Sequence, residues 1–354
     1  MKTKKEFRFM ENSLDYIRLF AAMQVAITHY LNLTFVRYGV NGVADGVLLW
    51  FKRALSLFPG VVILFAVSGF LMGASLEKQE NKGIFLKKRV LRIYPALWVS
   101  ILCNAALVWT VLAPAGKQIR DLLIWCVIQG AGAAYTPGFL KEFGAGSING
   151  ALWTIMVELQ FYLLIWLFWN FLKKRTTRWW GILTGLAAIA NLLVWYCQKQ
   201  MILPESVLSL LDRSCIPYLF WFLLGILGYR LKEQIIPVLT KHWYWLFAGF
   251  VLYKGCWLLL KWNVPGYYAD IVTGLILPAL VLGAAYLWGK HRVRKEISYG
   301  IFLYHWPLIN VIFHFGLAEK VNCVLLFAGY VAAYLLLAEA SRRFVEKPAA
   351  DKFL

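Results

Sequence analysis

The sequence has few charged residues for its length. Only 16% of its 354 residues are charged, whereas 61% are apolar and 17% are aromatic. A soluble globular domain usually has about 25% charged and about 45–50% apolar residues. The mean hydropathy of +0.62 departs from a soluble protein in the same direction. These values exclude a soluble globular enzyme and predict an all-α, polytopic integral membrane protein.

Motifs that mark several common classes of site are also missing. The six cysteines are scattered without a C-x-x-C pair, no His-x-x-x-His occurs, and there is neither a P-loop nor a G-x-G-x-x-G. These absences argue against a disulfide framework, a zinc site and the common nucleotide-binding loops. We therefore expect no metal cofactor.

Long apolar windows separated by polar breaks predict about ten transmembrane helices, because a helix needs about 20 mostly apolar residues to cross a bilayer. A further segment, 120–133, is too short to count and fits an interfacial or re-entrant segment. No connection is long enough to form a soluble domain, so residues 1–354 are expected to form a single transmembrane domain. The ten windows are 14–36, 57–76, 93–113, 150–171, 179–197, 214–230, 243–260, 270–288, 297–315 and 322–344.

The excess of basic residues predicts the orientation of these spans. The chain has 37 Lys and Arg against 18 Asp and Glu, a net charge of +19. With the N-terminus inside, the inner segments hold 25 of these Lys and Arg, the outer segments hold 11, and Arg18 lies within the first span. The inner segments are 2–10, 77–92, 172–178, 230–241, 289–296 and 342–354, and the outer segments are 37–56, 114–149, 198–213, 254–269 and 316–321. Because basic residues collect in cytoplasmic loops, both termini are expected in the cytoplasm, in a multi-pass protein of the cytoplasmic (inner) membrane. The charge therefore requires no nucleic-acid partner.

The first predicted span carries two ionisable residues, Arg18 and His29. Their spacing of eleven residues corresponds to three helical turns plus about 20°, and to about 16 Å along the axis. They therefore share one face of the helix. Ionisable residues inside a bilayer are costly and are functional candidates, although Arg18 is also explained as a snorkelling anchor and His29 as a hydrogen-bonded core residue.

Arg89 and Arg92 lie three residues apart in the second inner loop. They point the same way if a helix already includes them. Two guanidinium groups at a cytoplasmic helix end suit a phosphate or pyrophosphate group. Attraction to anionic lipid headgroups explains the same pair equally well.

Glu158 is a carboxylate about two turns inside an otherwise apolar window, so a partner for it is expected. Counted from the predicted outer ends of their helices, Glu158 and His29 lie at similar depths, about 12 Å and about 10 Å. At such a position a carboxylate can fix the tautomer of a histidine and raise its basicity. The sequence does not establish whether the two helices are neighbours.

Further polar residues mark two other windows. His305 follows Tyr304 and precedes Pro307, which is expected to kink the helix and to free carbonyl groups nearby. Ser68 adjoins Gly69, and close helix packing is the default explanation of such a pair. As a functional alternative, Ser68, Tyr304 and His305 line a passage through the bundle.

Taken in order, these segments resemble the membrane acyltransferase-3 family. The resemblance covers residues 14–348, and its single departures are modest, such as Ala66 where an aromatic residue is more usual. It rests on Leu14-Asp15, the Arg-x10-His pair Arg18/His29, F-x-x-S-G-F ending at Phe70, Arg89-x-x-Arg92-Ile-x-Pro95, Asn149-Gly150, Leu152-Trp153-Thr154 with Glu158 and Tyr162, Ile297-Ser298-Tyr299, Tyr304-His305-Trp306-Pro307 and Phe344-Val345-Glu346-Lys347-Pro348.

The resemblance implies an O-acyltransferase that moves an acyl group, most commonly acetyl, from acyl-CoA on the cytoplasmic side to a hydroxyl group of a carbohydrate acceptor. Surface polysaccharides and glycolipids are such acceptors. It also implies that Arg18 and His29 form the signature pair and that Arg89 and Arg92 bind the donor. Our hypothesis for the site is catalytic residues His29, Glu158 and Arg18, and donor-binding residues Arg89, Arg92, Ser68, Tyr304 and His305.

A proton-coupled transporter or flippase of a glycan or small metabolite is the alternative, because intramembrane Arg, His and Glu residues are equally common in carriers. No inverted repeat relates the two halves of the sequence, which argues against a carrier. The sequence leaves open the acceptor, the acyl chain, a covalent acyl-enzyme and the oligomeric state, with a homo-oligomer among the options.

Overall fold

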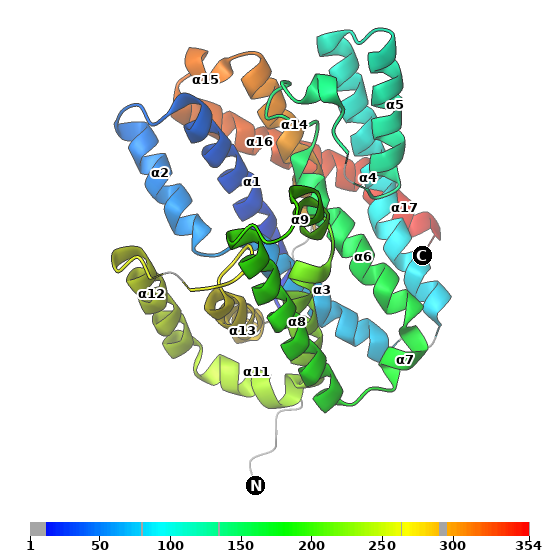
Figure 1. The fold of residues 1–354 in the computed structure, drawn as a ribbon, viewed down its shortest axis with the longest axis vertical. Coiled ribbons are helices and arrows are strands. Elements are labelled where there is room, and N and C mark those ends of the chain that lie inside the picture. The colour runs from blue at the N-terminus through cyan, green and yellow to red at the C-terminus, as the bar shows by residue number, and fades with distance from the viewer. Residues whose placement is uncertain (1–11, 79–80, 134, 263, 290–295, 354) are drawn as a thin grey trace. The chain divides into compact units, whose positions relative to one another are not determined.

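The computed structural model describes residues 12–78, 81–133, 135–262, 264–289 and 296–353. Throughout these ranges every regular element is a helix (Figure 1), which confirms the all-α fold class. The elements are α1 (Leu14–Tyr38), α2 (Val43–Ser56), α3 (Gly60–Lys78), α4 (Lys82–Leu112), α5 (Lys117–Gly130), η1 (Gly138–Leu140), η2 (Gly150–Leu152), α6 (Trp153–Leu167), α7 (Trp169–Lys173), α8 (Thr177–Lys199), α9 (Glu205–Asp212), η3 (Ile216–Tyr218), α10 (Leu219–Arg230), α11 (Lys232–Lys241), α12 (Trp243–Leu259), α13 (Ile271–Leu287), α14 (Ser298–His314), α15 (Leu317–Lys320), α16 (Cys323–Ser341), the π-helical turn η4 (Arg342–Glu346) and α17 (Lys347–Phe353).

Each of the ten predicted windows contains a helix. Six helical segments of the described chain are long and apolar enough to cross a bilayer, and eight are if each of two bent helix pairs forms one span. The protein is therefore a multi-pass membrane protein, whereas the count of ten and the cytoplasmic placement of both termini stay predictions. The basic segment 2–10 and most of the inner loop 289–296, which contribute to that placement, lie outside the described residues.

Some helical residues lie outside the predicted windows. α4 begins at Lys82, eleven residues before the predicted start at residue 93, and the Asn81 side chain caps it by accepting a 2.7 Å hydrogen bond from the Gly83 backbone N–H. The basic residues of the second inner loop are thus helical, because charge lowers hydropathy without breaking a helix. α2 lies in the predicted outer loop 37–56. α5 covers most of the weak segment 120–133 and packs against α4.

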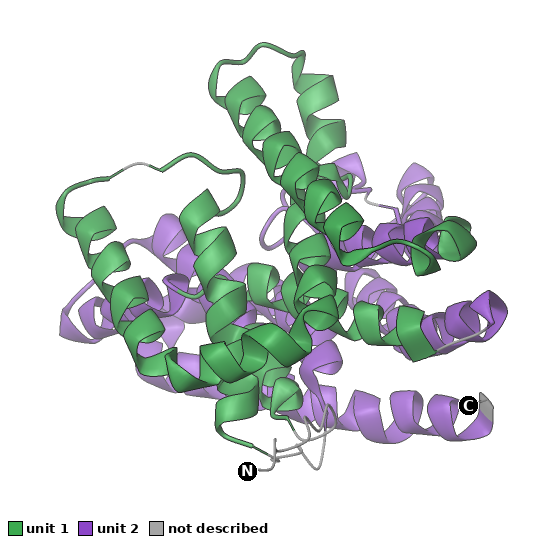
Figure 2. Ribbon diagram, turned by 90° about the horizontal axis from the view of Figure 1, so that it is seen from below, with its two compact units in different colours: residues 1–21, 58–80, 167–294 green, residues 22–57, 81–166, 295–354 purple. Residues whose placement is uncertain are grey.

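The chain folds into two compact units (Figure 2). Unit 1 comprises residues 1–21, 58–80 and 167–294, and unit 2 comprises residues 22–57, 81–166 and 295–354. Helix α1 contributes its first two turns to unit 1 and its remaining turns to unit 2. Each unit is described below by itself.

Unit 1 is organised around the close contact between α3 and α10. A methyl group added at Gly69 would lie 1.9 Å from the backbone oxygen of Phe222, and one added at Gly225 would lie 2.1 Å from the backbone oxygen of Ala66. The two backbones therefore touch, which is the packing that small residues permit between membrane helices. Ser68, next to Gly69, is half-buried in this region.

Unit 2 is organised around α14. Its Gly300 lies against Ala338 of α16, whose Cα would be 2.7 Å from an added methyl group. The Tyr299 hydroxyl donates a 2.9 Å hydrogen bond to the Ile93 carbonyl of α4. The Tyr330 hydroxyl of α16 donates a 3.0 Å bond to the Ala26 carbonyl of α1. The first two contacts hold α14 against α16 and α4, and the third holds α1 against α16.

The α3–α10 contact gives a test of packing. Gly69→Ala is expected to lower the apparent melting temperature of the detergent-solubilised protein by several degrees, because overpacking a close contact costs about 1–3 kcal/mol. Gly249→Ala in α12 is the matched control, since an added methyl group there meets nothing within 4 Å. Because Ala favours helix more than Gly, the control should melt no lower than the wild type. Equal melting of the two variants would contradict this packing.

Candidate active site

Helices α1 and α14 bring two imidazole rings together in unit 2. His29 Nδ1 lies 3.1 Å from His305 Nε2, and the rings are stacked with centroids 5.3 Å apart and planes 20° apart. His305 is fully buried, whereas His29 is half-buried. The structure therefore pairs two predicted site residues that lie 276 positions apart in the sequence.

The partners of His305 determine where the protons lie. His305 Nδ1 is 3.0 Å from the Ile301 carbonyl oxygen, which can only accept, so Nδ1 carries the proton. The neutral His305 then presents a lone pair at Nε2, and His29 must donate from Nδ1 to that atom. His29 therefore carries its own lone pair at Nε2. Among the described residues, no polar group bonds to this nitrogen.

Trp306 forms one wall beside the imidazole pair. Its ring centroid lies 5.2 Å from that of His29, with the planes at 80°. The indole N–H donates a 3.2 Å hydrogen bond to the Ser147 carbonyl. A methyl group at Gly150 would come within 2.4 Å of the indole, so only glycine lets the chain approach Trp306 this closely.

Pro307 explains why the loop 144–150 reaches α14. Because proline has no backbone N–H, the Leu303 carbonyl lacks its helical donor four residues on. The Asn149 side chain donates a 2.8 Å hydrogen bond to the Leu303 oxygen, and the Ser100 hydroxyl of α4 donates a longer one of 3.4 Å. The predicted freeing of a carbonyl near Pro307 is thus confirmed, and Asn149 and Ser100 satisfy that carbonyl.

Asn310, which no sequence motif singled out, holds the rest of the loop. It is fully buried, and its Oδ1 accepts a 2.9 Å bond from the Ala145 backbone N–H. Its Nδ2 donates bonds of 2.9 Å to the carbonyl oxygens of Ser147 and Ile148. A lone asparagine in an apolar helix, five residues after His305, was the available signal, since such residues bond across membrane helices.

Glu158 lies in a second polar cluster of unit 2. Its carboxylate accepts a hydrogen bond from the Tyr162 hydroxyl one turn later on α6. The Arg89 guanidinium lies over the Tyr162 ring, 5.2 Å from its centroid, and over the Phe85 ring at 5.5 Å. The structure thus associates Glu158 with the arginine pair and gives His29 a different polar partner, His305.

The reason for this difference is the place along α14 at which α6 begins. The hydropathy window that starts at residue 150 predicts the outer end of a helix there. In the structure the loop 144–150 packs against the middle of α14, so α6 begins beside Leu303 and Trp306. Glu158, nine residues after Asn149, lies about 13 Å further along. It falls near the first turn of α14 and not beside His29.

Arg92 completes the second cluster. Its guanidinium lies 3.9 Å from the carboxylate of Glu296, whose other oxygen accepts a 3.1 Å bond from the Ser298 backbone N–H at the start of α14. Arg89 and Arg92 belong to the same unbroken helix, as the proposed phosphate-binding pair requires. Their counterion Glu296 was not singled out from the sequence.

The remaining predicted residues occupy different places. Arg18 lies on α1 in unit 1, three turns before His29 on an unbroken helix. Ser68 also belongs to unit 1. Tyr304 is 8% exposed in unit 2 and interacts with Ser341. In the described part of the chain, no group of three or more His, Cys, Asp and Glu residues could hold a metal ion.

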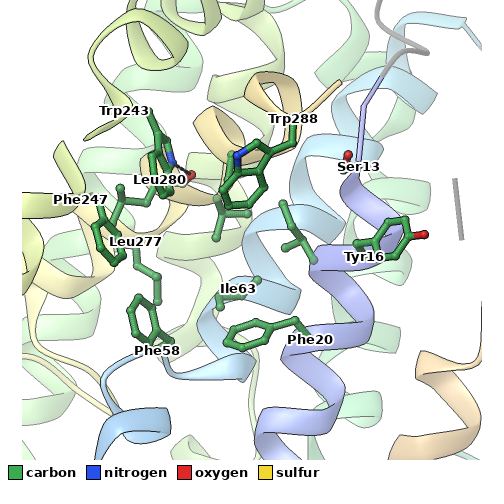
Figure 3. Close-up of a pocket in the computed structure, with 13 residues that line it drawn as sticks. Ser13, Tyr16, Phe20, Phe58, Ile63, Trp243, Phe247, Leu277, Leu280 and Trp288 are labelled. Carbon is green, nitrogen blue, oxygen red and sulfur yellow. Dashed lines mark hydrogen bonds between the residues drawn. The ribbon is translucent and has the colours of Figure 1, made fainter. Parts of the chain in front are cut away.

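Unit 1 contains an apolar cavity of about 540 Å³ between residues of α1, α3, α12 and α13 (Figure 3). Aromatic rings such as Phe20, Phe58, Trp243 and Trp288 surround it. Its lining includes Ser13, whose hydroxyl is already bonded to the Gly289 carbonyl at 2.7 Å. Apart from Ser13 and Tyr16, the lining carries no hydroxyl or charged side chain, so the cavity suits hydrocarbon.

The described chain is a multi-pass helical membrane protein with a buried imidazole pair and an arginine cluster in unit 2. A family model described as an acyltransferase domain matches residues 11–338. Because this match covers nearly the whole chain, the protein belongs to the membrane acyltransferase-3 family.

Curated relatives are similar to this chain over most of its length. Nodulation protein 10 of Rhizobium leguminosarum bv. viciae is 28% identical over 334 residues, which is 86% of this chain and 84% of the relative. An O-acetyl transferase of Shigella phage Sf6 is 24% identical over 321 residues, 85% of each chain. The O-acetyltransferase OatA of Staphylococcus aureus is 22% identical over 382 residues, 96% of this chain but 57% of the longer relative. No solved structure matches the chain.

The bond between Asn149 and Leu303 gives a second test. Asn149→Ala is expected to cost about 1–3 kcal/mol, because it leaves a buried carbonyl without its best donor. In a Pro307→Ala background the helix can supply its own N–H to that carbonyl, so the cost should fall by about 1 kcal/mol or more. The free energy of detergent-induced unfolding of the wild type, the two single variants and the double variant measures this coupling.

The Pro95→Ala background in α4 is the control for that cycle. Pro95 lies inside a helix but frees a different carbonyl, that of Leu91. The cost of Asn149→Ala should therefore be unchanged in that background. If Asn149→Ala lowers the free energy of unfolding equally in the wild type, in Pro307→Ala and in Pro95→Ala, the Leu303 carbonyl does not depend on Asn149 for its hydrogen bond.

Proposed function

We propose that this protein transfers an acyl group, most commonly acetyl, from acyl-CoA on the cytoplasmic side of the membrane to a hydroxyl group of a carbohydrate acceptor. Family membership supports acyl transfer. The names of two relatives, both O-acetyltransferases, support an oxygen acceptor and an acetyl group. A surface polysaccharide or a glycolipid is the proposed acceptor.

One observation carries the proposal: in unit 2 the arginine cluster and the imidazole pair lie at two different positions along α14. Near its first turn, Tyr299 bonds to α4, which carries Arg89 and Arg92, and Arg92 lies beside Glu296 just before that turn. Six residues further, about 9 Å along the axis, His305 bonds to His29. The first position suits a phosphate-bearing donor and the second suits acid–base chemistry, so an extended thioester can connect them.

His29 is the proposed general base. Its Nε2 lone pair takes the proton of the acceptor hydroxyl while that oxygen attacks the thioester carbonyl. The carbon–sulfur bond then breaks, and the imidazolium returns the proton to the CoA thiolate. The same lone pair can accept the acyl group transiently, which gives a covalent route through His29. Both routes need His29 Nε2 to be unprotonated at the start.

His305 is a positioning residue in this mechanism. By accepting from His29 Nδ1, it fixes the tautomer that leaves Nε2 available. The carboxylate of a serine-protease triad has the same orienting role. His305 is neutral, so it orients His29 without adding a negative charge to an apolar environment, where a charge is costly.

Arg89 and Arg92 are the proposed ligands of the donor phosphates. Arg89 is held over two aromatic rings and Arg92 beside Glu296, so both guanidiniums are positioned before a ligand binds. Lys87 and Lys88 are exposed on the same helix and add positive charge. Planar guanidinium groups suit the bidentate recognition of phosphate.

Arg18, Ser68 and Tyr304 keep the roles expected from the sequence, whereas the proposed roles of Glu158 and His305 differ from those expected. Arg18 is proposed to assist catalysis from α1, and Glu158 is proposed to act at the arginine cluster, where it holds Tyr162. Ser68 and Tyr304 are proposed to contact the donor. The carrier alternative loses its support because the chain belongs to a family of acyltransferases.

His29 gives the main test. His29→Ala is expected to lower kcat for acetyl-CoA-dependent acetylation by about 10²–10⁴-fold, the range lost with a general base. His314→Ala, which removes an exposed histidine of the same helix as His305, should keep wild-type activity. Release of free CoA by purified protein in the presence of a glycan acceptor measures both. Wild-type acetylation by His29→Ala at equal expression would refute the proposal.

His305 is distinguished from a merely structural residue by partial rescue. His305→Ala should lower kcat by about 10–100-fold with little change in KM for acetyl-CoA. His305→Gln should recover much of that loss, because its amide oxygen can accept from His29 Nδ1. Equal kcat for the alanine and glutamine variants would contradict the positioning role.

Arg89 and Arg92 are tested by comparing two donors. Arg89→Gln and Arg92→Gln should each raise KM for acetyl-CoA by about tenfold or more, since a charge-assisted hydrogen bond contributes about 1.5–3 kcal/mol. Their KM for acetyl-pantetheine, which lacks the nucleotide and its phosphates, should equal that of the wild type. Lys88→Gln, the control, should have a smaller effect. An equal loss with both donors would exclude phosphate recognition by these arginines.

A further inference from the structure

Two predicted outer loops of unit 1 meet in a network of polar and aromatic residues. Asp212, at the end of α9, accepts hydrogen bonds at Oδ1 from Gln198 Nε2 at 2.7 Å and from the Tyr267 hydroxyl at 2.8 Å. The Tyr218 hydroxyl donates to the Asp212 backbone oxygen at 3.0 Å. Residues 198–213 and 254–269 are thus tied together.

The second of these loops, residues 254–269, is held by polar contacts at Tyr267 and at Asp270, which directly follows it. On one side, Asn191 Oδ1 accepts a 3.1 Å bond from the Tyr267 backbone N–H. On the other side, Asp270 forms an ion pair of 3.2 Å with Lys254, and both side chains are at least nine-tenths buried. Asp270 also accepts a 2.7 Å bond from the Tyr253 hydroxyl. A buried ion pair adds little net stability but strongly constrains geometry when it is fully bonded.

Between these two fixed points lies Tyr268, whose backbone is strained. Its φ is +64°, in the left-handed region that bulky residues avoid. The residue is 49% exposed, so complete burial does not explain the strain. The ring is held edge-on against Tyr218 and Trp221, with centroid distances of 6.2 Å and 6.0 Å. Strain of this kind persists where the surroundings enforce it, and it collects at binding sites.

We propose that Tyr268, together with Asp212 and Gln198, binds a sugar ring of the carbohydrate acceptor; this inference rests on the proposed function. The apolar C–H face of a pyranose packs on an exposed aromatic ring, and its hydroxyls bond to carboxylate and amide groups. Asp212 Oδ2 has no hydrogen-bond partner among the described residues, while its Oδ1 is held in place. Tyr218 connects the two parts, because it touches both the Tyr268 ring and Asp212.

The strain distinguishes this site from an ordinary interfacial aromatic residue. Tyrosines collect at the membrane surface without any special backbone conformation. Tyr244 on α12, which is 67% exposed in a regular helix, is such a residue. The predicted topology also places both loops on the outer face, opposite the donor. If both loops lay on the donor side instead, a nucleotide would be the competing ligand, so the experiment must exclude it.

The test uses the full chain in lipid nanodiscs and saturation-transfer NMR with chitotetraose, maltotetraose and adenosine monophosphate as probes. Tyr268→Gly removes the ring and also relieves the strained backbone, so its melting temperature should not fall. Tyr244→Ala is the matched control. We expect at least one tetrasaccharide to bind the wild type and Tyr244→Ala, and its Kd to rise about tenfold or more in Tyr268→Gly.

Three results would overturn the inference: neither tetrasaccharide binds the wild type, Tyr268→Gly binds the sugar as tightly as the wild type does, or Tyr268 is needed for adenosine monophosphate and not for sugar. These measurements contain no acyl donor, so they do not depend on catalysis. Tyr268-dependent sugar binding without any acetyl transfer would contradict the proposed function alone. Acetyl transfer with an unchanged acceptor KM in Tyr268→Gly would contradict only this inference.

Discussion

The hydrogen bond between His29 and His305 is the interaction on which the site depends. In its neutral form His305 donates from Nδ1 to the Ile301 carbonyl and accepts at Nε2, so the bond forms when His29 donates from Nδ1. One backbone carbonyl of α14 therefore determines the proton positions on two imidazoles. Helix α1 is kept in place for this bond by α16, whose Tyr330 bonds to the Ala26 carbonyl one turn before His29.

The surroundings of the imidazole pair follow from a rule of membrane proteins, that polar backbone groups buried away from water must be satisfied within the protein. Pro307 leaves the Leu303 carbonyl without a helical donor, and Asn149 supplies one. Asn310 bonds to the backbone of the loop that carries Asn149. The loop can then pack against the middle of α14, where it places Gly150 against Trp306.

Hydropathy predicted a helix in every one of the ten windows, because the length and apolarity of a segment are local properties. It missed α2, whose acidic and basic residues, such as Asp45, Lys52 and Arg53, lower the average. The sequence motifs identified His29 and His305 separately, but not their pairing, since that depends on which helices are neighbours. The expected proximity of Glu158 to His29 was not found, because the loop before α6 packs against the middle of α14, and hydropathy carries no information about such a loop.

The proton positions on the two histidines test the account most directly. The chain has five histidines, so a variant with the other three replaced and with ¹⁵N-labelled histidine gives resolved ring-nitrogen signals. At neutral pH we predict that His29 and His305 are both neutral, each with a protonated Nδ1 and an unprotonated Nε2, and that a cross-peak connects the two rings. A His29 ring protonated at Nε2, with no contact to His305, would contradict the account.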